Sequence, residues 1–172
     1  MSTNNEYISR NSLQKKLIYN ISPFTLLDYP GKTACIFWFA GCNMRCCYCY
    51  NPEIVKGKGK YSFYDAKQFL LSRLNLLDGV VMSGGECLLS DGIIDIIAEI
   101  KSMGYLVKVD TNGSKPETLR HLINRKLIDY VSLDFKATKA KTPYITKAEF
   151  YLEFTSCLNL LINSDIQCEV RT

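Results

Sequence analysis

The chain has a single histidine among its 172 residues, and this scarcity limits the chemistry that it can perform. His121 lies in a predicted helix with Arg120 and Arg125, where a surface position is more usual than a catalytic one. Histidine is the side chain that most often serves as a general base near neutral pH. We therefore assign no acid–base triad to this protein.

Long apolar runs are also missing. The longest, at residues 34–40, has the length of a strand and falls far short of the ~18 residues that span a bilayer. The first ten residues are polar and contain no apolar signal-peptide core. We expect no membrane association and a cytoplasmic, reducing setting, in which thiols remain free to bind metal.

Charge of one sign is not in excess either. The 21 Lys and Arg residues nearly balance the 17 Asp and Glu residues, and the net charge is +4. Such a balance argues against nucleic acid as a partner, because nucleic-acid binders carry a clustered basic face. The length suits one domain with a substantial core, and no repeat or linker divides it. We expect a single domain over residues 1–172, with residues 1–20 as an N-terminal extension.

Cysteine, by contrast, is plentiful, and four of the eight cysteines lie within residues 42–49. Cys42, Cys46 and Cys49 have the spacing C-x3-C-x2-C, with Tyr48 before the last of them. A structural zinc site needs four ligands, usually from two separated C-x2-C pairs, and no second pair follows here. Three thiolates on one loop instead fit three corners of a cubane iron–sulfur cluster and leave one iron open to a reactive ligand.

The other cysteines leave an alternative open. A zinc or redox loop, or an electron-carrier module, could use Cys47 or Cys87 as a fourth ligand. Cys35, Cys157 and Cys168 lie in apolar patterns, and we expect them to pack in the core as small hydrophobic side chains.

Short β-branched or aromatic runs alternate with segments of helical periodicity from residue 33 onward. The predicted strands span residues 33–39, 79–82, 105–109, 130–135 and 166–171. The predicted helices span residues 62–77, 91–103 and 116–126, and a last one runs from about 146 to 161. This alternation implies right-handed crossovers and an α/β fold with a parallel sheet, either doubly wound or a curved part of a β/α barrel.

Local signals set the ends of three of these helices. Ser62 and Asp65 have the spacing of a capping box at the start of the first helix, and Thr146 and Glu149 have it at the start of the last. Gly104 is a natural stop for the second helix.

Polar and glycine residues follow the predicted strands at the edge where catalytic groups of α/β proteins collect. Gly84, Gly85 and Glu86 follow the second strand, and the glycines allow close backbone approach while the carboxylate can hold an ammonium group. Asp110 opens the turn 110–113 after the third strand, where it could hold a cation, a hydroxyl or a ligand charge. Asp134 ends the fourth strand, and we interpret it with Lys136, two residues on, as a solvated pair.

Together these motifs resemble the radical S-adenosylmethionine (SAM) superfamily, in which a C-x3-C-x-Tyr-C loop precedes a Gly-Gly-Glu motif on a β/α scaffold. The resemblance covers residues 20–172 and implies a partial (βα) barrel of about five to six parallel strands with outer helices. Within the superfamily, the chain is similar to glycyl-radical enzyme activating proteins, in particular that of anaerobic (class III) ribonucleoside-triphosphate reductase. The similar segments are residues 24–32, 41–43, 51–53, 110–113 and 134–136.

The resemblance implies an oxidoreductase with a [4Fe-4S] cluster on Cys42, Cys46 and Cys49. The open iron chelates the amino and carboxylate groups of SAM. One electron, from a flavodoxin- or ferredoxin-type donor, then splits SAM into methionine and a 5′-deoxyadenosyl radical. That radical takes a hydrogen atom from a backbone glycine of a partner glycyl-radical enzyme, for which anaerobic ribonucleotide reductase is the expected candidate.

The same resemblance assigns contacts to SAM. Gly84, Gly85 and Glu86 help to hold its amino end, Asp110 lies near its carboxylate either directly or through a monovalent cation, and Arg171 is a further candidate contact. The alternative within the superfamily is an enzyme acting on a small molecule, such as a 7-carboxy-7-deazaguanine synthase. That reading needs a largely sealed pocket, and the chain looks too short to close one.

Three features depart from the family pattern. Cys87 stands where a proline is usual, and Tyr50 where a histidine is frequent, although neither position ligates the cluster. The superfamily scaffold commonly has six βα units, and the fifth strand is barely complete at Thr172. We expect a chain truncated there to have a bare strand edge and to lack some SAM contacts.

Overall fold

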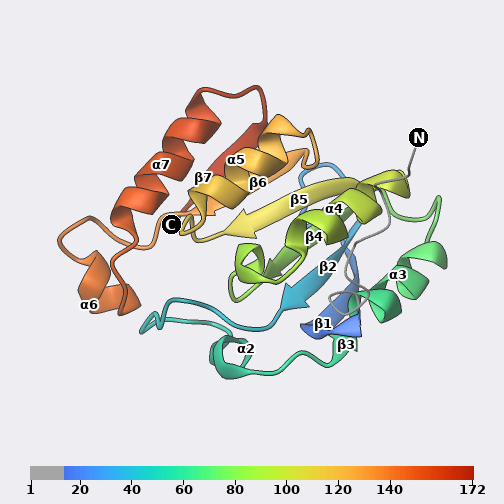
Figure 1. The fold of residues 1–172 in the computed structure, drawn as a ribbon, viewed down its shortest axis with the longest axis horizontal. Coiled ribbons are helices and arrows are strands. Elements are labelled where there is room, and N and C mark those ends of the chain that lie inside the picture. The colour runs from blue at the N-terminus through green and yellow to red at the C-terminus, as the bar shows by residue number, and fades with distance from the viewer. Residues whose placement is uncertain (1–13) are drawn as a thin grey trace, which may run out of the picture.

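A computed structural model describes residues 14–172 as a curved, mixed sheet with helices packed on one of its faces (Figure 1). The strands are β1 (Lys16–Thr25), β2 (Ala34–Phe39), β3 (Tyr61–Ser62), β4 (Gly79–Gly84), β5 (Leu106–Thr111), β6 (Tyr130–Asp134) and β7 (Gln167–Arg171). The helices are α2 (Pro52–Lys56), α3 (Phe63–Leu71), α4 (Ile93–Ser102), α5 (Pro116–Asn124), α6 (Thr142–Thr146) and α7 (Tyr151–Ile162), with a 3-10 turn η1 (Cys87–Leu89).

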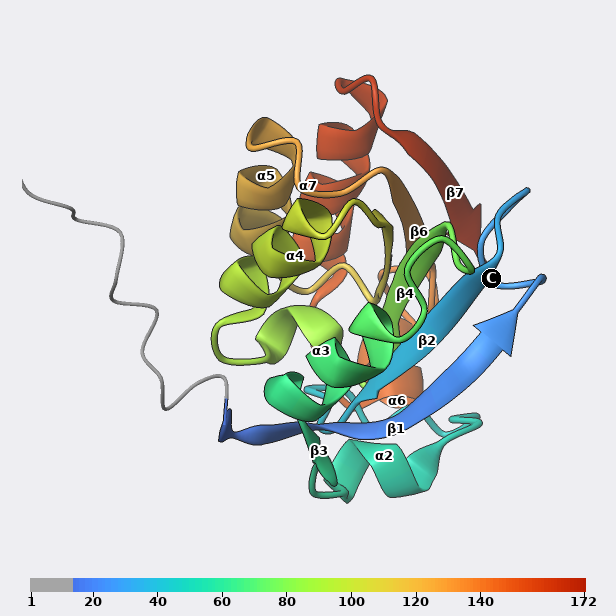
Figure 2. The same cartoon turned by 90° about the vertical axis from the view of Figure 1, so that its right-hand side faces the viewer.

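The seven strands lie in the order β3-β1-β2-β4-β5-β6-β7. Five strands pair in parallel, in the order β2-β4-β5-β6-β7. Helices α4, α5 and α7 lie in the connections from β4 to β5, from β5 to β6 and from β6 to β7. Figure 2 shows α3, α4, α5 and α7 together on one face of the curved sheet, and Figure 1 shows α2 and α6 on the side toward which the parallel strands point. This arrangement confirms the predicted α/β fold, a partial barrel of parallel strands with outer helices.

The sheet also contains two strands that the sequence did not predict. β1 pairs antiparallel with β2, and the two-residue β3 pairs antiparallel with β1. The expected N-terminal extension is therefore wrong for residues 16–20, which belong to β1; residues 1–13 lie outside the described part of the chain. Pro23 lies within β1 and has no N–H to donate, which is the usual mark of a strand near a sheet edge.

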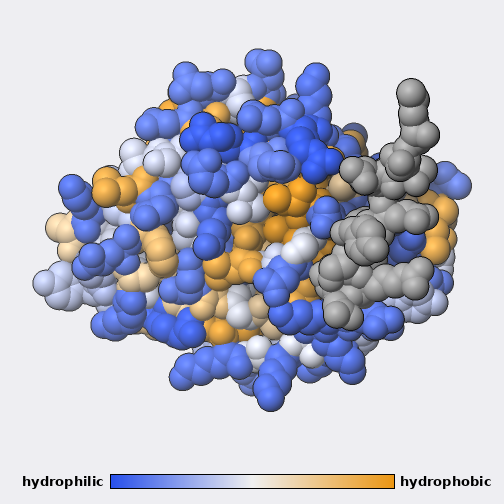
Figure 3. Space-filling model, in the orientation of Figure 1, coloured by the Kyte–Doolittle hydropathy of each residue, from blue (hydrophilic) through white to orange (hydrophobic). Residues whose placement is uncertain are grey.

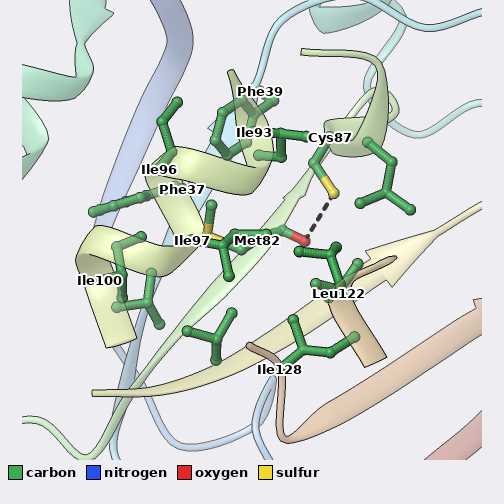
Figure 4. Packing of buried hydrophobic residues seen from close by; sticks show 14 of the residues in the cluster. Phe37, Phe39, Met82, Cys87, Ile93, Ile96, Ile97, Ile100, Leu122 and Ile128 are labelled. Atoms are coloured by element: carbon green, nitrogen blue, oxygen red, sulfur yellow. Dashed lines mark hydrogen bonds between the residues drawn. The ribbon is translucent and has the colours of Figure 1, made fainter. Parts of the chain in front are cut away.

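The main hydrophobic core lies between the sheet and the outer helices. The isoleucine stripe predicted for α4 is buried and packs against alternate residues of β2, β4 and β5. Figure 4 shows Ile93, Ile96, Ile97 and Ile100 around Phe37 and Met82. A smaller cluster of Tyr29, Ala34, Ile36 and Val81 fills the concave face of the sheet.

Two helices differ from their predicted extents. α3 ends at Leu71 rather than near 77, and the chain then passes through Asn75 with a left-handed φ of 64°. The last helix begins at Tyr151 rather than Thr146, because Lys147 has a left-handed φ of 56° and interrupts the backbone. Thr146 ends the separate helix α6, and its hydroxyl accepts the Ala148 N–H at 3.2 Å.

Cysteine burial follows the sequence prediction at two of three positions. Cys35 and Cys157 are buried in the core, whereas Cys168 is exposed. The prediction for Cys168 is wrong because β7 is the last strand of the sheet and pairs on one side only within residues 14–172.

Polar side chains dominate the visible surface of the molecule, with an apolar strip in the middle of the view in Figure 3. Within residues 14–172, every helix is too short or too polar to cross a membrane.

The predicted capping box at the start of α3 is present, and it provides a test of the local structure. The Ser62 hydroxyl accepts the Asp65 N–H at 3.2 Å, and the Asp65 carboxylate accepts the Ser62 N–H at 2.8 Å. We expect Ser62→Ala to lower the free energy of unfolding by about 1 kcal/mol, measured by urea denaturation. Ser156→Ala on the exposed face of α7 is the control, and an equal loss in both variants would contradict the assigned cap.

Candidate functional site

A cleft opens at the carboxyl ends of the five parallel strands, and residues far apart in the sequence meet in its wall. The three cysteines of the spaced motif contribute, as do residues from the end of every one of these strands. Among its lining residues are Cys42, Cys46, Cys49, Ser83, Gly84, Gly85, Asp110, Thr111, Asn112, Asp134, Lys136 and Arg171. The site residues predicted from the sequence therefore line the cleft at this edge of the sheet, except for Glu86.

The loop that carries Cys42, Cys46 and Cys49, here called the cysteine loop, is hydrogen-bonded to the segment that follows β6. The backbone N–H groups of Arg45 and Cys47 donate to the carbonyl oxygens of Thr146 and Ile145 in α6, at 2.7 and 3.0 Å. The Tyr48 hydroxyl donates to the Lys136 carbonyl at 3.1 Å. Helix α6 thus supports the loop through main-chain contacts, which side-chain patterns in the sequence could not reveal.

The three thiols of the motif are half-buried and free. Burial raises the pKa of Cys42 and of Cys46 above the usual value for a thiol, so metal binding must displace their protons. Within residues 14–172, no three Cys, His, Asp or Glu side chains converge closely enough to chelate one metal ion. A cubane cluster binds each cysteine at a different iron, and a donor set of three separated thiols on one loop fits that demand.

Cys47 and Cys87, the two candidates for a fourth metal ligand, lie outside the cleft. Cys87 is fully buried in the core, where its thiol donates to the carbonyl oxygens of Met82 at 3.5 Å and Asp110 at 3.4 Å (Figure 4). Cys47 is exposed, and neither it nor Cys87 lines the cleft. The proposed fourth thiolate of a zinc site therefore has no support from the positions of these two side chains.

The two glycines of the Gly-Gly-Glu motif bring two loops into backbone contact. Gly84 has a positive φ of 120°, and a Cβ there would lie 2.3 Å from the Phe39 nitrogen. A Cβ on Gly85 would lie only 1.9 Å from the Gly41 carbonyl oxygen. Any side chain at either position would push the turn after β4 away from the cysteine loop.

Glu86 has a different position from the one that the sequence suggested. Its side chain is 1% exposed and faces the turn after β5 instead of the cleft. The carboxylate accepts the Asn112 N–H at 2.7 Å, the Thr111 hydroxyl at 2.9 Å and the Leu88 N–H at 3.1 Å. Glu86 therefore fixes the relative positions of two turns that do line the cleft, and its carboxylate is fully engaged in doing so.

Asp110 lies at the centre of a buried charge network on the concave face. Its carboxylate accepts from Lys108 at 2.5 Å, from the Ser83 hydroxyl at 3.2 Å and from Arg171 at 3.3 Å. Lys108 is only 1% exposed, and its ammonium group lies 4.0 Å from the Glu169 carboxylate. Positive charge beside Asp110 is thus supplied by two protein side chains.

Arg171 extends this network to the next strand. Its guanidinium also donates to Asp134 at 2.9 Å, and Lys136 donates to the same carboxylate at 3.0 Å. Although burial alone would lower the pKa of Arg171, Asp110 and Asp134 keep it above its usual value. Asp134 and Lys136 do form the predicted pair, but their side chains are only 24% and 26% exposed and form part of the cleft wall.

Sequence reasoning missed two groups that shape this site. Lys108 stands two residues before Asp110, so the two side chains lie on the same face of β5. A lone lysine in an otherwise apolar strand is unusual, and this signal could have identified Lys108 as part of the site. Asn43, between the first two cysteines, donates to the Ser114 hydroxyl at 2.8 Å and so ties the cysteine loop to the turn after β5. His121, as expected, is exposed on α5 and lies outside the cleft.

The partial barrel and its carboxyl-end cleft define an α/β protein with a cysteine loop after the first parallel strand. Residues 36–171 match the sequence profile of the radical SAM superfamily. The match covers most of the chain, and the protein belongs to this superfamily. Membership implies a [4Fe-4S] cluster and SAM as cofactors.

Several known proteins are similar to the chain. A Methanocaldococcus jannaschii protein described as a glycyl-radical enzyme activating enzyme is 36% identical over 148 residues, which cover 83% of this chain and 56% of that protein. A pyruvate formate-lyase-activating enzyme of Clostridium pasteurianum is 34% identical, over 69% of this chain and 52% of its own length. The chain therefore spans about half the length of these relatives.

One solved structure has nearly the same extent as the chain. The crystal structure of QueE from Escherichia coli matches with a TM-score of 0.57 at 13% identity and covers 99% of this chain and 88% of that one. At this level of identity, the similarity shows a shared fold.

Burial of Glu86 predicts a pH dependence of stability. Desolvation raises its pKa from 4.5 to about 7, against the opposing effect of its hydrogen bonds to Asn112, Thr111 and Leu88. The unfolded chain ionises this group at lower pH than the folded chain does, so the free energy of unfolding falls as pH rises from about 4.5 to 7. We expect the wild type to lose about 3 kcal/mol more than Glu86→Gln across this window, measured by urea denaturation. Parallel pH curves for the two proteins would contradict this assignment.

Proposed function

We propose that this chain is the core of a radical SAM activase, which binds a [4Fe-4S] cluster through Cys42, Cys46 and Cys49 and installs a glycyl radical on a partner enzyme. The observation that carries the proposal is the position of these three thiols on one wall of the cleft. Cys42, Cys46 and Cys49 would hold the cluster there, and a cluster with three protein ligands would have one iron available to bind SAM. The two relatives described as activating enzymes support the choice of reaction.

Other lining residues of the cleft suit the charged end of SAM. Arg171 and Lys136 both line the cleft and can attract its carboxylate, while backbone groups of Gly84 and Gly85 lie beside the cysteine loop and can meet its amino group. Asp110 already has Lys108 and Arg171 as partners, so these side chains take the role that a monovalent cation could have had. Glu86 acts indirectly, because it holds the turn that carries Asn112.

With its cofactors bound, the site supplies one electron to the carbon–sulfur bond of SAM, giving methionine and a 5′-deoxyadenosyl radical that takes a hydrogen atom from a glycine. The side chains of Arg171 and Lys136 and the backbone of Gly84 and Gly85 would keep SAM oriented for this step. A flavodoxin- or ferredoxin-type protein is the proposed electron donor. The proposed partner is a glycyl-radical enzyme, with anaerobic ribonucleotide reductase as the first candidate.

The test combines anaerobic reconstitution with two readouts. Reduced, reconstituted protein should convert SAM to 5′-deoxyadenosine and methionine, and it should generate a glycyl radical on anaerobic ribonucleotide reductase, detected by electron paramagnetic resonance. Turnover of SAM without a radical on this or another glycyl-radical enzyme would favour a small-molecule substrate, as in the 7-carboxy-7-deazaguanine synthases. One zinc and no acid-labile sulfide after reconstitution would overturn the proposal.

The adjacent cysteines provide a matched pair of variants. Cys46→Ala should abolish cluster assembly, because Cys46 lines the cleft together with the other two thiols of the motif. Cys47→Ala, one residue away and exposed, should retain the full content of iron and sulfide. Iron and sulfide analysis with the visible absorption spectrum measures both, and equal loss in the two variants would show that the ligands are wrongly assigned.

A further inference from the structure

The carboxamide of Asn112 has only one orientation that satisfies its neighbours. Its Oδ1 accepts the Ser114 backbone N–H at 2.9 Å, and a backbone N–H can only donate. The amide nitrogen must therefore point the other way, where it donates to Asn43 Oδ1 at 3.0 Å and approaches Cys42 Sγ at 3.8 Å. The assignment of nitrogen and oxygen in this side chain thus follows from its hydrogen-bond partners.

Cys42 is distinguished from the other two cysteines of the motif by these donors. Its sulfur also receives the Met44 backbone N–H at 3.4 Å. Within residues 14–172, no N–H group of another residue donates to the sulfur atoms of Cys46 and Cys49. The three thiolates would therefore differ electronically, because these N–H donors favour the charged form of Cys42 and oppose the effect of its burial.

Asn112 is held rigidly in this position. It is 5% exposed, and its backbone N–H donates to the buried Glu86 carboxylate at 2.7 Å. Asn43, which receives its amide, is fixed in turn by the Ser114 hydroxyl at 2.8 Å. Because its backbone N–H and its side-chain oxygen are both hydrogen-bonded, Asn112 has little freedom to rotate away from the sulfur.

We propose that Asn112 donates a hydrogen bond to the Cys42 thiolate and thereby raises the reduction potential of the cluster. The inference rests on the proposed function, since it needs a cluster on Cys42. Reduction adds one electron, taken from an external one-electron donor, to the cluster and its thiolates. A positive N–H dipole at the sulfur stabilises this added charge, and hydrogen bonds to the sulfurs are known determinants of cluster potential.

The test measures the potential itself. Wild type, Asn112→Leu and Asn112→Asp are reconstituted anaerobically and titrated with dithionite, in the absence of SAM, with the reduced cluster followed by electron paramagnetic resonance. Both variants lack the donor, so their midpoint potentials should be more negative than that of wild type, and the aspartate should shift it further because of its charge. Asn159→Leu, on the exposed surface of α7, is the control and should leave the potential unchanged.

The outcomes separate this inference from the proposed function. Iron and sulfide content show first whether each protein holds a cluster. A full cluster in either variant with an unchanged or more positive potential overturns the role of Asn112 and leaves the proposed function intact. A wild-type protein that assembles no cluster overturns both. The aspartate variant keeps the test decisive if the leucine variant fails to fold, because it has nearly the shape of asparagine.

Discussion

The architecture of the site depends on one close backbone contact between the loops that follow β2 and β4. The N–H of Gly85 donates to the Phe39 carbonyl at 3.0 Å, and the N–H of Glu86 donates to the Gly41 carbonyl at 2.9 Å. These bonds continue the parallel pairing beyond the ends of the strands and place the glycine turn against the cysteine loop. Glycine is required because a Cβ at Gly84 or Gly85 would overlap main-chain atoms. The Gly-Gly motif is thus explained by protein packing before any ligand is considered.

The sequence predicted the parts of this protein whose signals are local. The parallel strands β2, β4 and β6 are mostly apolar runs, and the sheet edge at which the carboxyl ends of the parallel strands meet follows from the alternation of strands and helices. β1 escaped prediction because polar residues and Pro23 break its pattern, and its antiparallel position at the edge side of β2 tolerates both. The position of α6 beneath the cysteine loop depends on main-chain contacts between residues about one hundred positions apart, and no periodicity encodes them.

The orientation of Glu86 shows that the residue types of a sequence motif do not by themselves determine where its side chains point. Residues after Glu86 form the short turn η1, and the Leu88 N–H draws the carboxylate away from the cleft. The second partner, Asn112, follows a different strand, so the direction of the side chain is decided by a tertiary contact. A buried carboxylate without donors would be costly, and the three hydrogen bonds to Glu86 offset that cost.

Two networks of polar side chains support the cleft, one beside the cysteine loop and one on the concave face of the sheet. On the cysteine side, the Glu86 carboxylate and the amides of Asn112 and Asn43 form a chain of hydrogen bonds that positions the loop. On the concave side, the buried Lys108 and the partly exposed Arg171 hold Asp110 through ion pairs. Buried ion pairs contribute little net stability, since desolvation cancels most of the attraction, yet removing one member leaves a costly unpaired charge. The concave network therefore contributes rigidity and a fixed pattern of charge more than folding energy, and fixed charge is what a cleft needs to orient a zwitterionic ligand beside a redox centre.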